Sequence, residues 1–194
     1  MSKTHKTAVV LIPPEDVWEP IQEIRRAHDR QVLRWMPHVT LLYPFRPAGE
    51  FGPAAEALRA RLSAIPPFEV TLVRFRHFAH GPASFTVWLE PEPADALREL
   101  HRALLEACPD CDDTARHPGG FHPHVSVGQF RGRRAALDRF LARLADSWRA
   151  LRFAADRVSL IARGDPPDDV FRVALELPLG GGSPRRGDPG RAAR

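Results

Sequence analysis

The two halves of the chain carry the same order of predicted elements, and this repeat constrains the fold more than any other feature. Each half has a β-rich run, a helix, a strand that opens with proline and histidine, a second helix and a closing strand. The repeat period of roughly 85 residues is far longer than the period of a solenoid repeat. We therefore expect two similar lobes that pack against each other.

Apolar periodicity and turn residues locate the elements within each half. In the first half, the predicted strands span 7–12, 37–43 and 68–75, and the predicted helices span 15–33 and 53–65. In the second half, the strands span 85–89, 123–127, 153–162 and 170–177, and the helices span 94–107 and 137–148. The apolar phase shifts between Leu72 and Val73, which predicts a β-bulge in that strand.

These elements predict one two-lobed domain over residues 1–180, followed by a tail. The expected lobes span about 7–78 and 84–178, with exchange of strands between them left open. Residues 181–194 contain no apolar residue except alanine, and they hold four Arg against one Asp. We expect this segment to be a disordered basic tail.

Charge and hydropathy exclude two classes of protein. The formal net charge is +4, and most of it falls in the tail, so the body lacks the broad basic face that non-specific duplex binding needs. The chain contains no run of 18 apolar residues, so no transmembrane helix is predicted. The apolar run near the N-terminus is too short for a secretory signal. We expect a soluble, cytoplasmic protein.

Both halves carry the pattern His-x-Thr/Ser-apolar, as HVTL at 38–41 and HVSV at 124–127. The bare pattern is weak, because a chain of this composition would contain a match by chance. A third match begins at His5, and we set it aside because of its place near the N-terminus. The other two share a context: each follows a proline, opens a predicted strand and occupies the same position in the repeated unit.

Side chains alternate between the two faces of a strand, so His38 and Thr40 share one face, as do His124 and Ser126. Pseudo-twofold packing of the lobes would place two imidazoles and two hydroxyls around one groove. Such a set suits displacement at phosphorus, because one imidazole can take a proton from water while the other protonates the leaving oxygen. The hydroxyls can donate to the non-bridging oxygens. The alternative is that these are ordinary, half-exposed strand residues.

Three stretches extend these motifs to a resemblance to a known family. They are 37–45 (PHVTLLYPF), 120–130 (GFHPHVSVGQF) and 158–180, the last with Arg163 and Phe171. Over residues 6–180 the chain resembles the 2H phosphoesterase superfamily, which includes 2′-5′ RNA ligase-like proteins and RNA 2′,3′-cyclic phosphodiesterases. The resemblance implies an α+β fold of two pseudo-twofold-related lobes, in which antiparallel sheets flank a central groove and helices lie outside.

The resemblance also implies roles for the motif residues. His38 would be the general acid and His124 the general base, while Thr40 and Ser126 would bind the phosphate. RNA ends or small cyclic nucleotides would be the substrates, opened to a 2′-phosphate without a metal, a cofactor or an obligate protein partner. Serine replaces the commoner threonine in the second motif and keeps the hydroxyl. Gln129 stands where some relatives have arginine, which leaves the identity of the substrate open.

Three alternatives remain open, one for the position of Phe130 and two for the function of the chain. Strand alternation places Phe130 on the groove side, where it would stack on a base, although it could equally close the core at the end of the strand. A binding module for RNA ends without turnover would use the same fold. A zinc protein built on Cys108, Cys111, His117 and His122 is a third reading, set against two free thiols and two loop histidines.

Overall fold

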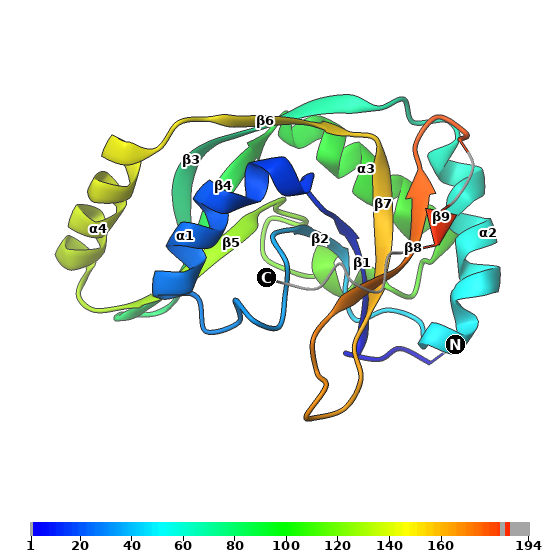
Figure 1. Cartoon of the computed structure of the whole chain (residues 1–194), viewed down its shortest axis with the longest axis horizontal. Helices are drawn as coiled ribbons and strands as arrows, with labels where there is room; N and C mark the ends of the chain where they lie inside the picture. Colours follow the sequence, from blue (N-terminus) through cyan, green and yellow to red (C-terminus); the bar gives the residue numbers. More distant parts are fainter. Residues whose placement is uncertain (1, 183–184, 187–194) are drawn as a thin grey trace.

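The computed structural model describes residues 2–182 and 185–186, and Figure 1 shows their arrangement. The strands are β1 (Thr7–Leu11), β2 (Val39–Leu42), β3 (Phe68–Gly81), β4 (Ser84–Glu92), β5 (Val125–Arg131), β6 (Leu151–Ala155), β7 (Arg157–Ala162), β8 (Arg172–Pro178) and β9 (Arg185–Arg186). The helices are α1 (Trp18–His28), α2 (Phe51–Leu62), α3 (Ala94–Ala107) and α4 (Arg134–Ser147). None of these helices is long and apolar enough to cross a membrane.

The strands form one antiparallel sheet whose two halves meet at the motif strands. The strand order is β6-β3-β4-β5-β2-β1-β7-β8-β9. Strands β2 and β5 pair only through Val39 and Val125, which are the residues that follow the two motif histidines. The sheet therefore consists of two four-stranded halves, with β9 added at one edge, joined at a narrow seam. This arrangement confirms the two-lobed α+β fold with antiparallel sheets.

Strands and helices are exchanged between the two halves of the chain. Strand β3 of the first half pairs with β4, the first strand of the second half, and β7 of the second half pairs with β1, the first strand of the chain. Helix α1 packs against β5, and α3 packs against β2. Figure 1 accordingly shows α1 and α4 at one end of the molecule and α2 and α3 at the other. The exchange of strands, which the sequence left open, therefore takes place across the expected boundaries at 7–78 and 84–178.

The segment predicted as one strand over 153–162 forms two strands in opposite halves of the sheet. Strand β6 pairs with β3, whereas β7 pairs with β1, and the chain crosses between the halves near Asp156 (Figure 1). Apolar periodicity shows that both pieces are extended, but it carries no signal for the change of partner.

Two other predictions need correction at element ends. The first long helix ends at His28 rather than at residue 33, because the Asp29 carboxylate bonds to the Arg25 side chain and to the Gln31 amide and so favours a turn. The segment from 181 is not wholly irregular, since β9 pairs with Leu175 and Glu176 of β8. An edge strand offers unpaired backbone groups to such a segment. The rest of the predicted tail, 183–184 and 187–194, lies outside the described residues.

Two hydrophobic clusters hold the sheet from its two faces. The main cluster spans both lobes and includes Val39 and Val125. A smaller cluster lies on the opposite face of β1, β7 and β8; its buried members are Ala8, Val10, Trp18, Met36, Ile161, Phe171 and Val173. Strand β1 is buried on both faces for this reason, which explains its unbroken apolar run.

The bulge predicted near Val73 is confirmed, because the register of β3 against β4 shifts between Leu72 and Arg74.

Gly128 permits the close approach of α1 to β5, and its substitution tests that contact. A Cβ atom at Gly128 would lie 2.6 Å from the His28 Cβ and 2.8 Å from the His28 carbonyl oxygen. Gly128→Ala is therefore expected to lower the free energy of unfolding in urea by about 1–3 kcal/mol. The matched control is Gly52→Ala in α2, where nothing lies within 4 Å and stability should hold or rise. Equal stability of both variants would contradict this account of the packing.

Candidate functional site

A cavity of about 800 Å³ lies beside the seam between the lobes. Both motif strands contribute to it, through Thr40 from β2 and Ser126 from β5, together with His124. The other lining residues are His5, Tyr43, Pro44, Phe78, Ala79, His80, Thr86, Asp113, Thr114, His117, Pro118, Phe121 and His122. The predicted convergence of the two motifs is thus a feature of the structure.

The first motif holds its histidine just behind the cavity wall. The His38 Nδ1 lies 2.6 Å from the Met36 carbonyl oxygen, and its Nε2 lies 3.0 Å from the Thr40 hydroxyl. The Trp35 ring stacks on the imidazole with centroids 4.8 Å apart. His38 is half-buried and does not itself line the cavity, whereas Thr40 does. Burial lowers the pKa of His38 from 6.5 to about 4.

The second motif presents its histidine to the cavity directly. The His124 Nδ1 lies 2.8 Å from the His122 carbonyl oxygen. Two aromatic rings contact the imidazole edge-on, Phe78 at 5.0 Å and Trp88 at 5.9 Å between centroids. Burial lowers the pKa of His124 as well, and the neighbouring His117 and His122 lower it further.

The same local geometry fixes both imidazoles. In each motif a proline separates the histidine from the residue whose carbonyl contacts Nδ1, so the sequence is Met-Pro-His in one lobe and His-Pro-His in the other. A carbonyl oxygen only accepts, so Nδ1–H must donate to it. The neutral ring therefore keeps its lone pair on Nε2, and in the first lobe the Thr40 hydroxyl donates to that lone pair. In both lobes the backbone thus fixes which nitrogen of the neutral imidazole carries the lone pair.

The prediction that Phe130 faces the groove is wrong. Its ring stacks on Phe140 of α4 at 5.2 Å and packs against the main core. The register of β5 against β4 shifts at Val127, because Ser126 pairs with Trp88 while Gly128 pairs with Val87. This bulge reverses the alternation that follows Ser126, so Phe130 turns to the helix-covered face.

The structure does not bring together the four residues of the zinc alternative. Cys108 and Cys111 are buried in the main core, while His117 and His122 line the cavity. In the described part of the chain, no group of three His, Cys, Asp or Glu side chains is placed to hold a metal ion.

Sequence analysis missed the aromatic residues that surround the motif histidines. Trp35, Tyr43, Phe78 and Trp88 come from the loop before β2, the end of β2, β3 and β4. Tyr43 and Phe78 line the cavity, and Trp35 and Trp88 support the imidazoles from behind. Strand β3 extends to Gly81, beyond the predicted end at Phe75, and this extension carries Phe78 to the cavity.

The wall of the cavity near α3 rests on a buried histidine. His101 stacks on Phe121 with centroids 3.9 Å apart, and its Nε2 lies 2.9 Å from the Thr114 hydroxyl. That hydroxyl donates to the Leu41 carbonyl of β2, so it accepts from His101. His101 is 4 % exposed, and burial lowers its pKa to about 4.

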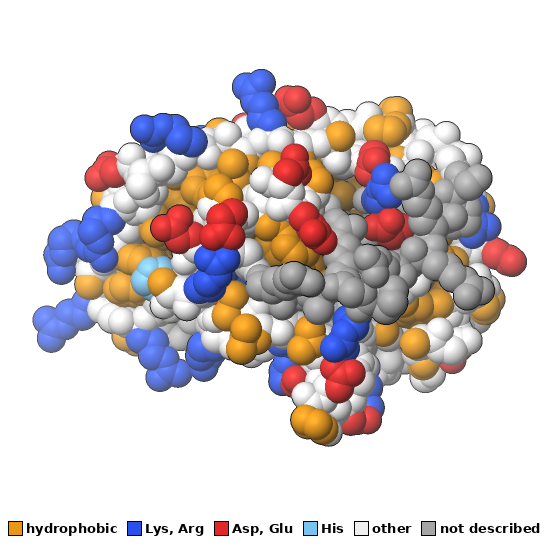
Figure 2. Space-filling model, viewed as in Figure 1, with side chains coloured by type: hydrophobic (Ala, Val, Ile, Leu, Met, Phe, Trp, Pro, Cys, Tyr) orange, Lys and Arg blue, Asp and Glu red, His pale blue; other side chains and the backbone are white. Residues whose placement is uncertain are grey.

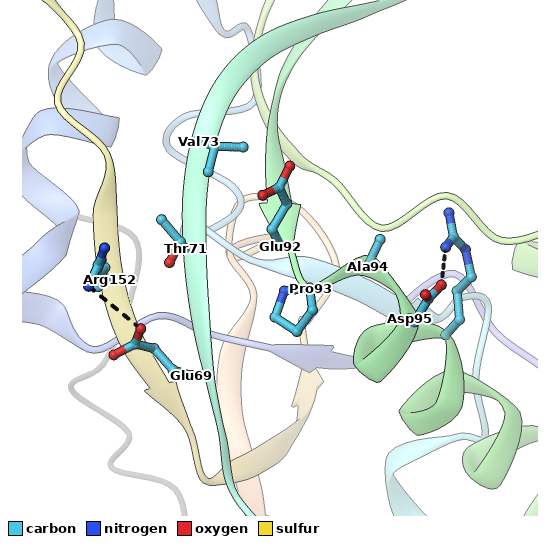
Figure 3. A pocket seen from close by; sticks show the side chains of 9 residues that line it. Glu69, Thr71, Val73, Glu92, Pro93, Ala94, Asp95 and Arg152 are labelled. Atoms are coloured by element: carbon cyan, nitrogen blue, oxygen red, sulfur yellow. Dashed lines mark hydrogen bonds and ion pairs between the residues drawn. The ribbon is translucent and has the colours of Figure 1, made fainter.

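A second hollow lies away from the motif residues, and its charged groups are already paired. Figure 3 shows the Glu69–Arg152 and Asp95–Arg98 ion pairs beside Thr71 and Glu92. On the face seen in Figure 2, Lys and Arg side chains gather at the end that carries α1 and α4, while acidic side chains lie nearer the centre. Neither feature brings together groups for proton transfer, so the cavity at the seam is the candidate site.

Comparison with known proteins agrees with this geometry. The family model of the 2′-5′ RNA ligase superfamily matches residues 13–167. The chain belongs to that superfamily, within the 2H phosphoesterases. A Geobacillus kaustophilus relative named "putative phosphoesterase" is 28% identical over 125 residues, which are 64% of this chain and 69% of the relative. A Staphylococcus aureus relative of the same name is 30% identical over 122 residues, 62% of this chain and 69% of the relative.

Solved structures show the same 2H fold. TT0787 of Thermus thermophilus matches with a TM-score of 0.57 and 23% identity, covering 91% of this chain and 99% of that one. The apo structure of E. coli LigT matches with a TM-score of 0.56 and 18% identity, covering 95% and 98%. The chain therefore shares the fold of these two proteins.

The buried His101 makes the stability of the cavity wall depend on pH. Its pKa is lowered in the folded chain, so the unfolded chain binds more protons between pH 6.5 and about 4, and folding weakens as the pH falls through that range. His101→Gln keeps an amide donor but does not titrate. We expect wild type to be the more stable at pH 7 and its advantage to shrink by about 1–3 kcal/mol at pH 4.5, measured by urea unfolding. A constant difference between the two proteins would contradict this assignment.

Proposed function

We propose that the protein is a metal-independent phosphodiesterase that hydrolyses 2′,3′-cyclic phosphates of RNA ends or nucleotides. The observation that carries the proposal is the pairing of two imidazoles, each held through Nδ1 and each followed two residues on by a hydroxyl that lines the same cavity. The cavity volume of about 800 Å³ suits a nucleotide. Structures of E. coli LigT with 3′-AMP and with phosphate support a nucleotide phosphate as the ligand class.

In the proposed reaction, His124 acts as the base. Its Nε2 takes a proton from a water molecule, and the water oxygen forms a bond to phosphorus. The bond from phosphorus to the 3′ oxygen breaks on the opposite side, and His38 supplies the proton to that oxygen. Thr40 and Ser126 donate to the non-bridging oxygens, whose negative charge grows in the transition state. The product carries a 2′-phosphate.

Because the pKa of His38 is low, we infer that its imidazole takes up the proton only when the substrate binds. In the free protein the Thr40 hydroxyl donates to Nε2, so the imidazole is neutral near pH 7. An anionic phosphate beside Nε2 favours the protonated ring, and it also offers the hydroxyl a new acceptor. Substrate and proton thus bind together, after which the ring can act as an acid.

Removal of either imidazole tests the pair. His38→Ala and His124→Ala are each expected to lower kcat/KM for a 2′,3′-cyclic mononucleotide by about 10²–10⁴-fold, because each removes a proton-transfer group. Thr40→Ala and Ser126→Ala should lose roughly 10²-fold. The control is His77→Ala, on the opposite face of β3 from Phe78, which should stay within a few-fold of wild type.

Two results would contradict the proposal. One is activity that a chelator abolishes and a divalent ion restores. The other is wild-type protein that binds the cyclic nucleotide without turnover, which would instead identify a binding module for RNA ends.

The pH profile and the product test the two roles separately. One imidazole must be neutral and the other protonated, and the pKa of each is lowered in the free protein. We therefore expect a bell-shaped profile of kcat/KM whose maximum lies on the acidic side of about pH 6.5, the ordinary pKa of histidine. Phosphorus NMR should detect the 2′-phosphate. A 3′-phosphate product would exchange the roles of His38 and His124, and a profile that rises steadily to pH 9 would exclude an imidazolium acid.

A further inference from the structure

Helix α1 ends in a buried ion pair that the proposed chemistry does not use. The Arg25 guanidinium is 2 % exposed, and its Nε donates to the Asp29 carboxylate at 2.9 Å. Its two other nitrogens donate to the Gln22 side-chain oxygen and to the Trp35 carbonyl, both at 2.8 Å. Burial of a guanidinium is costly unless every partner is in place, and an apolar side chain would pack a helix end with less penalty. The pair therefore calls for an explanation beyond stability.

The contacts of Arg25 lead directly to His38. The guanidinium holds the backbone of Trp35, whose ring stacks on His38 on one side and on Phe171, at 3.7 Å, on another. The next residue, Met36, supplies the carbonyl that accepts from the His38 Nδ1. Two successive residues of one loop thus orient the imidazole, and Arg25 holds the backbone of the first of them.

The second carboxylate oxygen of Asp29 extends the network to the other motif strand. It accepts from the Gln31 amide at 2.9 Å and from the Gln129 side-chain nitrogen at 3.1 Å. The Gln129 side-chain oxygen accepts in turn from the Arg30 amide at 3.0 Å. Gln129 lies on β5 three residues after Ser126, so these bonds link the loop before the first motif to the strand of the second.

We propose that the Arg25–Asp29 ion pair is a positioning element for His38 and that Gln129 ties it to the strand that carries His124. This inference rests on the proposed function, in which the two imidazoles act on one phosphate. The network spans the seam where β2 and β5 share a single register pair, so it fixes the distance between motifs that the sheet alone holds weakly.

The two charges of the ion pair also have opposite effects on the pKa of His38. Burial is the largest influence and lowers the pKa of His38, while the hydrogen bond to Met36 raises it. Among the nearby charges, those of Arg25 and His124 lower the pKa, and that of Asp29 raises it. Removal of one charge at a time should therefore move the pKa in opposite directions, which loss of packing alone would not do.

The test is an NMR titration of the His38 imidazole in the full chain, which needs no substrate. Arg25→Gln should raise the His38 pKa and Asp29→Asn should lower it, because each variant removes one of two opposite charges. The matched control is Arg26→Gln, which breaks an exposed ion pair with Glu19 on the same helix and should leave the pKa of His38 unchanged. Shifts of the same sign in the two test variants, or no shift, would overturn the electrostatic part of the proposal.

A double variant keeps the positioning claim testable if the single variants do not fold. Arg25→Met with Asp29→Leu replaces the pair by apolar groups of similar volume, a change that commonly preserves stability. We expect it to fold and to lose 10-fold or more in kcat on a cyclic mononucleotide while KM changes little, and Gln129→Met should act in the same direction. Wild-type kcat in the folded double variant would overturn the proposal. Because the titration does not depend on turnover, its result can still be interpreted if the proposed function fails.

Discussion

The site depends on one strand pairing, between Val39 of β2 and Val125 of β5. Both valines face the main core, so the alternation of the strands turns the neighbouring His and Thr or Ser side chains to the other face. A longer ladder would bring the two strands fully side by side and close the space between the motifs. A single pair lets the two halves of the sheet diverge immediately beyond it, and the cavity lies in that divergence.

Such a narrow seam leaves much of the site geometry to side chains. Aromatic rings back both imidazoles, and the carbonyl before each proline accepts from Nδ1. The same surroundings that orient the rings also remove water from them, and this lowers both pKa values. Orientation and low basicity are therefore two results of one packing arrangement, and a change in either is expected to alter the other.

The predictable part of the structure is the part that depends on local pattern. Alternation and proline positions identified both motif strands, and the repeat identified the two lobes and the cavity between them. The misplacement of Phe130 shows the limit of that method, because a single bulged residue on β5 reverses the face of everything after it. The division of 153–162 into β6 and β7 depends on partners far away in the chain, which no local pattern encodes. The burial of the Arg25–Asp29 pair was not predicted either, because charged residues at a helix end ordinarily lie in solvent.

The exchange of β3 and β7 between the halves gives a single chain the topology of a domain-swapped dimer. Two identical half-chains could build the same sheet only as a symmetric pair, each contributing a strand to the other across a true twofold axis. A cyclic phosphate on that axis would bind in two equivalent orientations and give two products in equal amounts. Joining the halves in one polypeptide lets the two sides differ, as Met36 differs from His122 and Thr40 from Ser126. In the proposed reaction, this difference between the two sides would let the site distinguish the two ester oxygens of a cyclic phosphate.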